Sequence, residues 1–237
     1  NPRRLARPFP CGLAPGVAAP RPGAYPAQGR LVPAGNGRGR GMAQPARIGV
    51  TGMGTMGAAL ALNIADKGVR VAVHNRTADR AHAVLEGAGP LADRMQTPDT
   101  LQALVSALEM PRTIVMMVPA GAAVRDTIAA LRPMLSEGDI LIDAGNADFR
   151  DTRAAAGLDG TGIALRDLGV SGGEEGARHG PSLMAGGDRA AWERVRGVFE
   201  AIAARHRGDP CAAWLGPDGA GHSSRPCTMA SNTPTWN

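Results

Sequence analysis

Residues 48–57 read Ile48-Gly49-Val50-Thr51-Gly52-Met53-Gly54-Thr55-Met56-Gly57. A short apolar segment, Arg47–Thr51, precedes the glycines, and Met56–Lys67 has apolar residues at helical spacing up to Gly68, which suits a helix end. Three glycines alone could mark only a turn, but a strand before them and a helix after them favour a dinucleotide site. Gly52 would permit the tight turn, Gly54 would let the backbone approach a pyrophosphate, and Gly57 would allow close packing of helix on strand. We therefore predict cofactor contacts from residues 52–57, including Met53, Thr55 and Met56, with N–H groups of the helix start facing the phosphates.

Strands and helices are predicted to alternate from residue 46 onward. The apolar segments predict strands at Arg47–Thr51, Val69–His74, Thr113–Val118, Asp139–Asp143, Ile163–Asp167 and Ser182–Ala185. Helical spacing predicts helices at Met56–Lys67, Ala78–Glu86, Thr100–Leu108, Ala122–Leu135, Phe149–Ala156 and Arg189–Arg205, with Pro133 disturbing the last turn of the fourth. This alternation predicts an α/β fold of the Rossmann type, a doubly wound and mostly parallel sheet with helices on both faces.

The end of the second predicted strand distinguishes the two nicotinamide cofactors. An NAD site usually has an acidic residue there to bind the ribose 2′-hydroxyl, whereas this chain has Asn75-Arg76-Thr77. A guanidinium with neighbouring amide and hydroxyl groups would bind a 2′-phosphate, which a carboxylate would repel. The sequence therefore predicts NADP as the cofactor, against the alternative that Arg76 is only a solvated turn residue.

The basic charge of the chain comes from its first 41 residues. The formal net charge is +5, but residues 1–41 contain seven Arg and no acidic residue, so the remainder carries +5 − 7 = −2. This distribution argues against nucleic-acid binding, and no apolar run approaches the roughly 20 residues of a membrane span. Eight Pro and eight Gly predict a disordered extension over residues 1–41, either translated from upstream of Met42 or, less in keeping with its lack of Ser, a transit peptide.

Cysteine and histidine are sparse and scattered. Cys11, Cys211 and Cys227 have no metal-ligand spacing, and the five His do not cluster. Free thiols are typical of a reducing compartment, so we expect a cytoplasmic protein without a metal site.

Several later segments resemble the long form of the decarboxylating 6-phosphogluconate dehydrogenases. They are ALNIADKGVRVAVHNRT, MMVPAG, GDILIDAGNADFRDT, LGVSGGEEGARHGPSLMAGG and FEAIAARHRGDPCAAWLGPDGAGH, in the family's order and spacing. The resemblance covers residues 46–222 and implies an NADP-binding domain over residues 42–222. A related 3-hydroxyacid dehydrogenase is the alternative, which the EEGARHGPS segment disfavours.

The resemblance also implies roles for particular residues. Val118, Pro119 and Ala120 would line the nicotinamide side of the cofactor, although the family commonly has Lys where Pro119 stands. Asn146 would contact both cofactor and substrate, and Ser171, Gly172 and Gly173 would hold the substrate. A Ser-Gly-Gly turn suits that role because it offers a hydroxyl and backbone N–H groups without bulky side chains.

The implied reaction is metal-independent oxidation of the 3-hydroxyl of 6-phosphogluconate with hydride transfer to NADP. Decarboxylation then yields ribulose 5-phosphate and CO2, a step of the pentose phosphate pathway. In the family a Lys serves as general base and a Glu as general acid, and a helical second domain completes the site and a homodimer.

The resemblance ends after His222. The family continues with a helix carrying the catalytic Lys, Glu and a Tyr, whereas residues 223–237 contain none of these residue types and form a polar, Pro-containing tail. Back-translating the tail with one added base reads Phe-Val-Lys-Ala-Val-His-Asn-Gly-Ile-Glu-Tyr, so we hypothesise a one-base frameshift, in the gene or in its sequencing. We expect no catalytic residue in this chain, which would make it an inactive fragment or a non-catalytic NADP-binding domain.

Overall fold

The computed structural model describes residues 44–145, 158, 160–217 and 219–223. Four predictions lie outside these residues: the extension over residues 1–41, the helix Phe149–Ala156, the role of Asn146 and most of the tail after His222.

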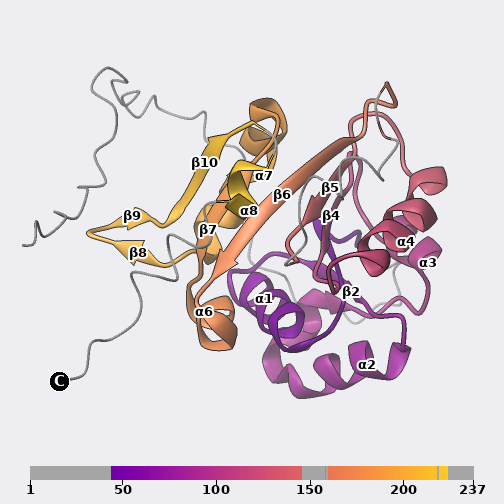
Figure 1. The fold of residues 1–237 in the computed structure, drawn as a ribbon. Coiled ribbons are helices and arrows are strands. Elements are labelled where there is room, and N and C mark those ends of the chain that lie inside the picture. Colours follow the sequence, from indigo (N-terminus) through magenta and orange to yellow (C-terminus); the bar gives the residue numbers. More distant parts are fainter. Residues whose placement is uncertain (1–43, 146–157, 159, 218, 224–237) are drawn as a thin grey trace, which may run out of the picture. The chain divides into compact units, whose positions relative to one another are not determined.

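Eight strands form one sheet in the order β10-β7-β6-β5-β4-β1-β2-β3. Their bounds are β1 Ile48–Thr51, β2 Val71–His74, β3 Met95–Gln96, β4 Thr113–Met116, β5 Ile140–Asp143, β6 Ala164–Ser171, β7 Ser182–Gly186 and β10 Ala212–Gly216. All neighbouring strands are parallel except β6 and β7, which run antiparallel (Figure 1). The predicted doubly wound, mostly parallel sheet is confirmed.

Helices connect the strands and cover both faces of the sheet. They are α1 Thr55–Asp66, α2 Ala78–Gly87, α3 Leu101–Ser106, α4 Ala122–Leu131, α6 Gly173–His179, α7 Arg189–Ile202 and the short α8 Ala220–Ser223. Two 3-10 turns, η1 Gly89–Arg94 and η2 Arg132–Met134, and a hairpin of β8 Arg205–His206 with β9 Asp209–Pro210 complete the described elements. No helix in these parts of the chain is long and apolar enough to cross a membrane.

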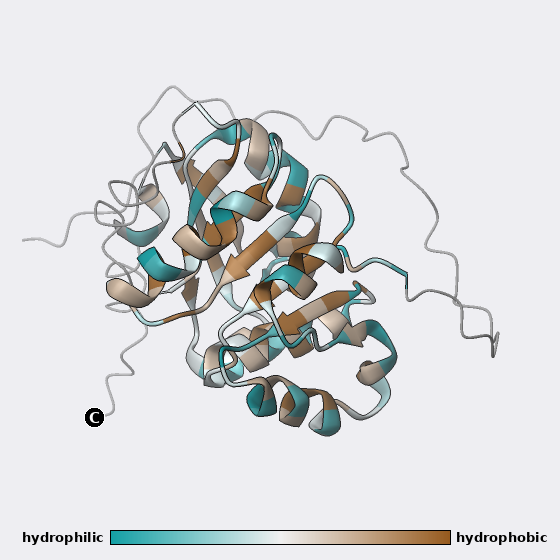
Figure 2. Cartoon of the chain, turned by 90° about the vertical axis from the view of Figure 1, so that its right-hand side faces the viewer, coloured by the Kyte–Doolittle hydropathy of each residue, from teal (hydrophilic) through white to brown (hydrophobic). Residues whose placement is uncertain are grey.

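The two faces of the sheet build two apolar cores because side chains alternate along each strand. On β4, Val115 packs into the core beneath α1 and α7, whereas Ile114 and Met116 pack beneath α3 and α4. Figure 2 shows the strands brown at the centre and the helices mixed with teal. Continuous apolar strands are therefore explained by burial on both sides, as the sequence indicated.

One buried side chain ties three helices together. The Asn63 Nδ2 of α1 donates to the backbone oxygen of Ala177 in α6 at 3.0 Å and to that of Ile202 in α7 at 3.1 Å. Asn63 has no solvent exposure, so these hydrogen bonds form away from competing water. The first helix is thereby held against the elements that follow β6.

Several boundaries differ from the predictions for local reasons. Pro133 lies within η2, so α4 ends at Leu131 and the helix predicted to Leu135 continues as a 3-10 turn. The helix predicted to Arg205 ends at Ile202 because Ala203 is extended and leads into β8. The strand predicted at Ile163–Asp167 runs on to Ser171, where the added residues pair with β7. The sequence analysis did not predict α6 or β10.

Candidate dinucleotide site at the carboxyl edge of the sheet

Three predicted cofactor segments meet at one edge of the sheet. Residues 52–57 follow β1, residues 75–77 follow β2 and residues 118–120 follow β4, and these three strands are adjacent and parallel. The chain winds outward from β1 through β2 to β3 and then returns to β4 on the other side of β1. Ligands of open α/β sheets bind at such a switch point, beyond the carboxyl ends of the strands.

Gly52 and Gly57 are required by the packing of the loop itself. Gly52 has φ +98°, and a Cβ there would lie 2.5 Å from the backbone oxygen of Met117. A Cβ on Gly57 would lie 2.0 Å from the backbone oxygen of Gly52. Both distances are far below van der Waals contact, so only glycine lets β1, β4 and α1 approach this closely.

Gly54 differs from Gly52 and Gly57, because a side chain at this position would point into open space. Its φ of −76° is allowed for any residue, and no atom lies within 4 Å of where its Cβ would be. Gly54 is the N-cap of α1, no side chain caps this helix, and its first turn has no acidic residue. The amino end of a 12-residue helix thus presents its N–H groups and positive dipole end to an open region, which suits an anion.

The end of β2 is joined to this loop by hydrogen bonds. Gly52 N donates to the backbone oxygen of His74 at 2.9 Å, and Met53 N donates to Asn75 Oδ1 at 2.9 Å. Beyond them, Arg76 and Thr77 are exposed, and neither side chain makes a hydrogen bond or ion pair with another described residue. The Arg76 guanidinium and the Thr77 hydroxyl are therefore available to bind a ligand beside the glycine loop.

A buried polar pair lies directly under the loop. Thr51 Oγ1 and His74 Nδ1 are 2.9 Å apart, and the two residues are only 3% and 6% exposed. Burial lowers the pKa of His74, because desolvation penalises the imidazolium, and the carboxylate of Asp99 offsets part of this effect. Neither residue was singled out from the sequence; a polar residue ending each of two paired apolar strands is the signal that could have done so.

The segment after β4 contacts the glycine loop. A Cβ on Gly52 would lie 3.1 Å from Val118 Cγ1, and one on Gly145, which follows β5, would lie 2.6 Å from the backbone oxygen of Val118. Pro119 and Ala120 are exposed. The next residue, Gly121, has φ +89° and is the N-cap of α4. Val118 is thus clamped between the ends of β1 and β5, whereas Pro119 and Ala120 border the open side.

The predicted substrate residues Ser171, Gly172 and Gly173 lie farther along the same edge. Asp143 at the end of β5 pairs with Asp167 of β6, so Ser171 lies four residues beyond this pair, about 13 Å at strand spacing. Ser171 is 5% exposed, and Gly172, at φ +118°, is the N-cap of α6. In the sheet, β4 and β5 separate β6 from β1, while α6, which begins at this turn, packs against α1 of the glycine loop.

The sequence analysis missed an anchor for the last described helix. Asp167 is 6% exposed, and its carboxylate accepts from Gly219 N at 3.0 Å and from His222 N at 2.9 Å. His222 Nε2 lies 3.1 Å from the backbone oxygen of Asp143, to which it can only donate. These contacts hold α8 beside the carboxyl end of β5 and the middle of β6, four residues before Ser171.

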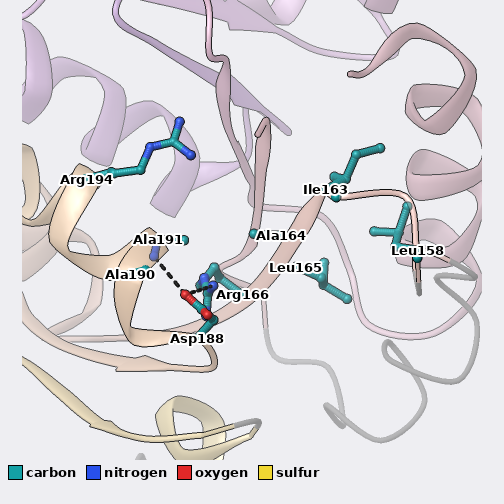
Figure 3. A pocket seen from close by; sticks show the side chains of 11 residues that line it. Leu158, Ile163, Ala164, Leu165, Arg166, Asp188, Ala190, Ala191 and Arg194 are labelled. Atoms are coloured by element: carbon teal, nitrogen blue, oxygen red, sulfur yellow. Dashed lines mark hydrogen bonds and ion pairs between the residues drawn. The ribbon is translucent and has the colours of Figure 1, made fainter. Parts of the chain in front are cut away.

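A hollow of about 480 Å³ lies at the opposite edge of the sheet, between the start of β6 and the start of α7 (Figure 3). Its wall includes Arg166 and Asp188, which form an ion pair at 3.4 Å. Its position before β6 puts it away from the switch point, so it is not our candidate cofactor site. Among the described residues, no cluster of His, Cys, Asp or Glu could hold a metal ion.

Comparison with known proteins gives one consistent match. The sequence profile described as the NAD binding domain of 6-phosphogluconate dehydrogenase matches residues 47–216. The decarboxylating 6-phosphogluconate dehydrogenase of Haemophilus influenzae is 46% identical over 177 residues, which are 74% of this chain and 36% of that enzyme.

Solved structures agree with the sequence comparison. Plasmodium falciparum 6-phosphogluconate dehydrogenase, studied in its apo form, with its cofactor NADP+ and with its substrate 6-phosphogluconate, aligns with a TM-score of 0.72 at 32% identity. The alignment covers 76% of this chain and 38% of that one. Mycobacterium tuberculosis 3-hydroxyisobutyrate dehydrogenase aligns with a TM-score of 0.61 at 25% identity, covering 78% and 59%. The chain thus spans little more than a third of the 6-phosphogluconate dehydrogenases that it matches.

Proposed function

The chain belongs to the family of NAD-binding domains of 6-phosphogluconate dehydrogenase, and from this premise we propose that it binds NADP where the loops after β1, β2 and β4 meet. The observation that carries the proposal is the open, uncapped amino end of α1 beside Gly54. We assign the binding domain to residues 42–222.

The pyrophosphate would lie over Gly54, because this residue leaves room for it and the first turn of α1 supplies N–H groups. Met53, Thr55 and Met56 flank that position, while Gly52 and Gly57 keep the loop against β4 and α1. When bound, the nicotinamide would supply the hydride acceptor for oxidation of the substrate in the whole protein. Val118, Pro119 and Ala120 would border it from the end of β4.

NADP is favoured over NAD by the charge at the end of β2. A 2′-phosphate placed beside Arg76 and Thr77 would gain charge-assisted hydrogen bonds, and these two side chains have no described partner to release first. Asp79, in the first turn of α2, is an acidic residue near this position, so the phosphate is expected to lie on the Arg76 side of the turn.

The reaction proposed for the whole protein is oxidative decarboxylation of 6-phosphogluconate to ribulose 5-phosphate and CO2 in the pentose phosphate pathway. Ser171, Gly172, Gly173 and Asn146 would contribute to holding the substrate. A homodimer and a cytoplasmic location are proposed from the family resemblance. Residues 223–237 contain no Lys, Glu or Tyr, so we propose that this chain binds NADP without turning over.

Calorimetric titration of residues 1–237 with NADP and NAD tests the cofactor proposal. We expect NADP to bind more tightly, and Arg76→Ala to weaken NADP at least about tenfold while changing NAD less than about twofold. Arg132→Ala is the matched control, because Arg132 is exposed on η2 at the other edge of the sheet. Equal affinity for both nucleotides, or no effect of Arg76→Ala on NADP, would contradict the proposal.

A further inference from the structure

The oxygen and the nitrogen of the Asn75 side-chain amide are both hydrogen-bonded to other residues of the protein. Its Oδ1 accepts from Met53 N at 2.9 Å, and its Nδ2 donates to the backbone oxygen of Thr77 at 3.0 Å. A backbone N–H can only donate and a backbone carbonyl can only accept, so these two partners fix the orientation of the amide. One side chain therefore bridges the glycine loop and the turn that carries Arg76.

The bridge continues the pairing of β1 with β2 beyond the ends of the strands. The last backbone hydrogen bond between the two segments runs from Gly52 N to the backbone oxygen of His74, next to the Thr51–His74 side-chain contact. Gly52 has φ +98°, and beyond it no backbone hydrogen bond joins the glycine loop to residues 75–77. The Asn75 amide provides the next link, from the second strand to Met53.

The side chains that remain available to bind a 2′-phosphate are those of the next two residues, Arg76 and Thr77. Arg76 and Thr77 are exposed and carry no hydrogen bond from their side chains to described residues, whereas Asn75 is half-buried and engaged on both sides. Met53 belongs to the loop that would hold the pyrophosphate, which NADP and NAD share.

We propose that Asn75 is a positioning residue that couples the glycine loop to the specificity turn at residues 76–77. Its oxygen sets the glycine loop and so supports both nucleotides, and its amino group sets the turn and so supports NADP alone. The inference rests on the proposed NADP site.

Two substitutions separate the two halves of the amide. Asn75→Ala removes both links, so NADP and NAD should each weaken by about tenfold or more. Asn75→Asp keeps an oxygen for Met53 N–H, but it places a carboxylate against the Thr77 carbonyl and beside the 2′-phosphate. It should therefore weaken NADP at least about tenfold while leaving NAD within about threefold.

Arg76→Ala and an amide control complete the comparison. Arg76→Ala should weaken NADP only, and Gln102→Ala, an exposed amide on α3, should change neither affinity. If Asn75→Ala weakened NADP but not NAD, Asn75 would act at the 2′-phosphate itself and the proposal would be wrong. An unchanged affinity for both nucleotides would also overturn it.

Hydrogen exchange without nucleotide tests the coupling independently of the cofactor site. The Met53 amide of the full chain should be protected in the wild type and in Asn75→Asp, and should exchange about tenfold or more faster in Asn75→Ala. Failure of the wild type to bind either nucleotide would remove the proposed function, yet this exchange pattern would still establish the Asn75 link to the loop. Equal Met53 exchange in all three proteins would overturn the link even if NADP binds.

Discussion

Gly54 and Gly57 are three residues apart in one loop, yet added side chains would meet different surroundings. At Gly54 the space is open and the backbone is extended, as in most N-cap residues. At Gly57 a methyl group would collide with a backbone oxygen that cannot rotate away. Packing therefore explains the second glycine but not the first, for which a bound pyrophosphate would account.

Gly54→Ser should separate nucleotide binding from folding. Serine is a favourable N-cap, so the free energy of unfolding should stay the same or rise by up to about 1 kcal/mol. The side chain would occupy the pyrophosphate position, so affinity for NADP and NAD should each fall at least about tenfold. Urea unfolding and calorimetric titration measure the two effects.

Gly57→Ala is the matched contrast in the same loop. Its methyl group would force α1 away from β1, and we expect unfolding to become easier by about 2 kcal/mol or more. If Gly54→Ser bound both nucleotides normally, the pyrophosphate could not lie over Gly54.

His74 should make the stability of the protein depend on pH. Its pKa in the folded protein lies below the ordinary 6.5, mainly because of burial, so the unfolded chain binds the proton more readily. The contribution of His74 to the free energy of unfolding is therefore fully present above pH 6.5. It decreases as the pH drops below 6.5 and becomes constant below the pKa of His74 in the folded protein.

His74→Asn tests this prediction because asparagine can still bond to Thr51 but does not titrate. Unfolding free energies measured between pH 7.5 and pH 5.5, about one unit either side of the ordinary value, should fall less in the variant than in the wild type. Identical slopes in the two proteins would show that His74 does not contribute to the pH dependence.

At the scale of elements, α7 depends on the carboxylate at its start. Asp188 Oδ1 accepts from Ala191 N at 2.9 Å and lies 3.4 Å from Arg166 Nη2 (Figure 3). The Arg166 side chain is 5% exposed, whereas that of Asp188 is 65% exposed, so solvent weakens the ion pair. The same oxygen therefore caps the helix and faces a buried cation.

Substitutions at Asp188 should separate the cap from the charge. Asp188→Ala removes both and should lower the free energy of unfolding by about 1–3 kcal/mol, while Asp188→Asn keeps an oxygen for the cap and should cost about half as much. Urea unfolding measures both, with Asp126→Ala on the exposed side of α4 as a control. Equal effects of Ala and Asn would mean that the cap contributes nothing.

At the scale of the whole molecule, nucleotide binding and turnover should be separable. Residues 1–237 should form no detectable NADPH from NADP and 6-phosphogluconate, because residues 223–237 offer no Lys as a general base and an Arg stays protonated. Absorbance of the reduced nicotinamide measures turnover, and thermal unfolding at saturating NADP supplies the matched test of binding. NADPH formation at a rate proportional to protein concentration would contradict the prediction.

The frameshift hypothesis has a separate test, which is sequencing the gene after the His222 codon.

Local pattern was sufficient for the fold class and for the glycine loop. Apolar runs such as Thr113–Met116 predicted buried strands, and the order of strand, GxGxxG and helix predicted the glycine turn between β1 and α1. Helix ends were less predictable. Ala203 ended α7 early because the chain enters a hairpin, and α6 was missed because its glycines read as a turn.

The sequence by itself determined the alternation of buried strands with helices, the residues of the glycine loop and the absence of an acidic residue after the second strand. These are properties of neighbouring residues, so spacing and residue type are enough to state them. The tertiary structure alone decided that Asn75 binds Met53, that Asp167 holds α8 and that Val118 is clamped between Gly52 and Gly145. Such contacts join residues 22 to 66 positions apart in the sequence, and only the order of strands in the sheet brings them together.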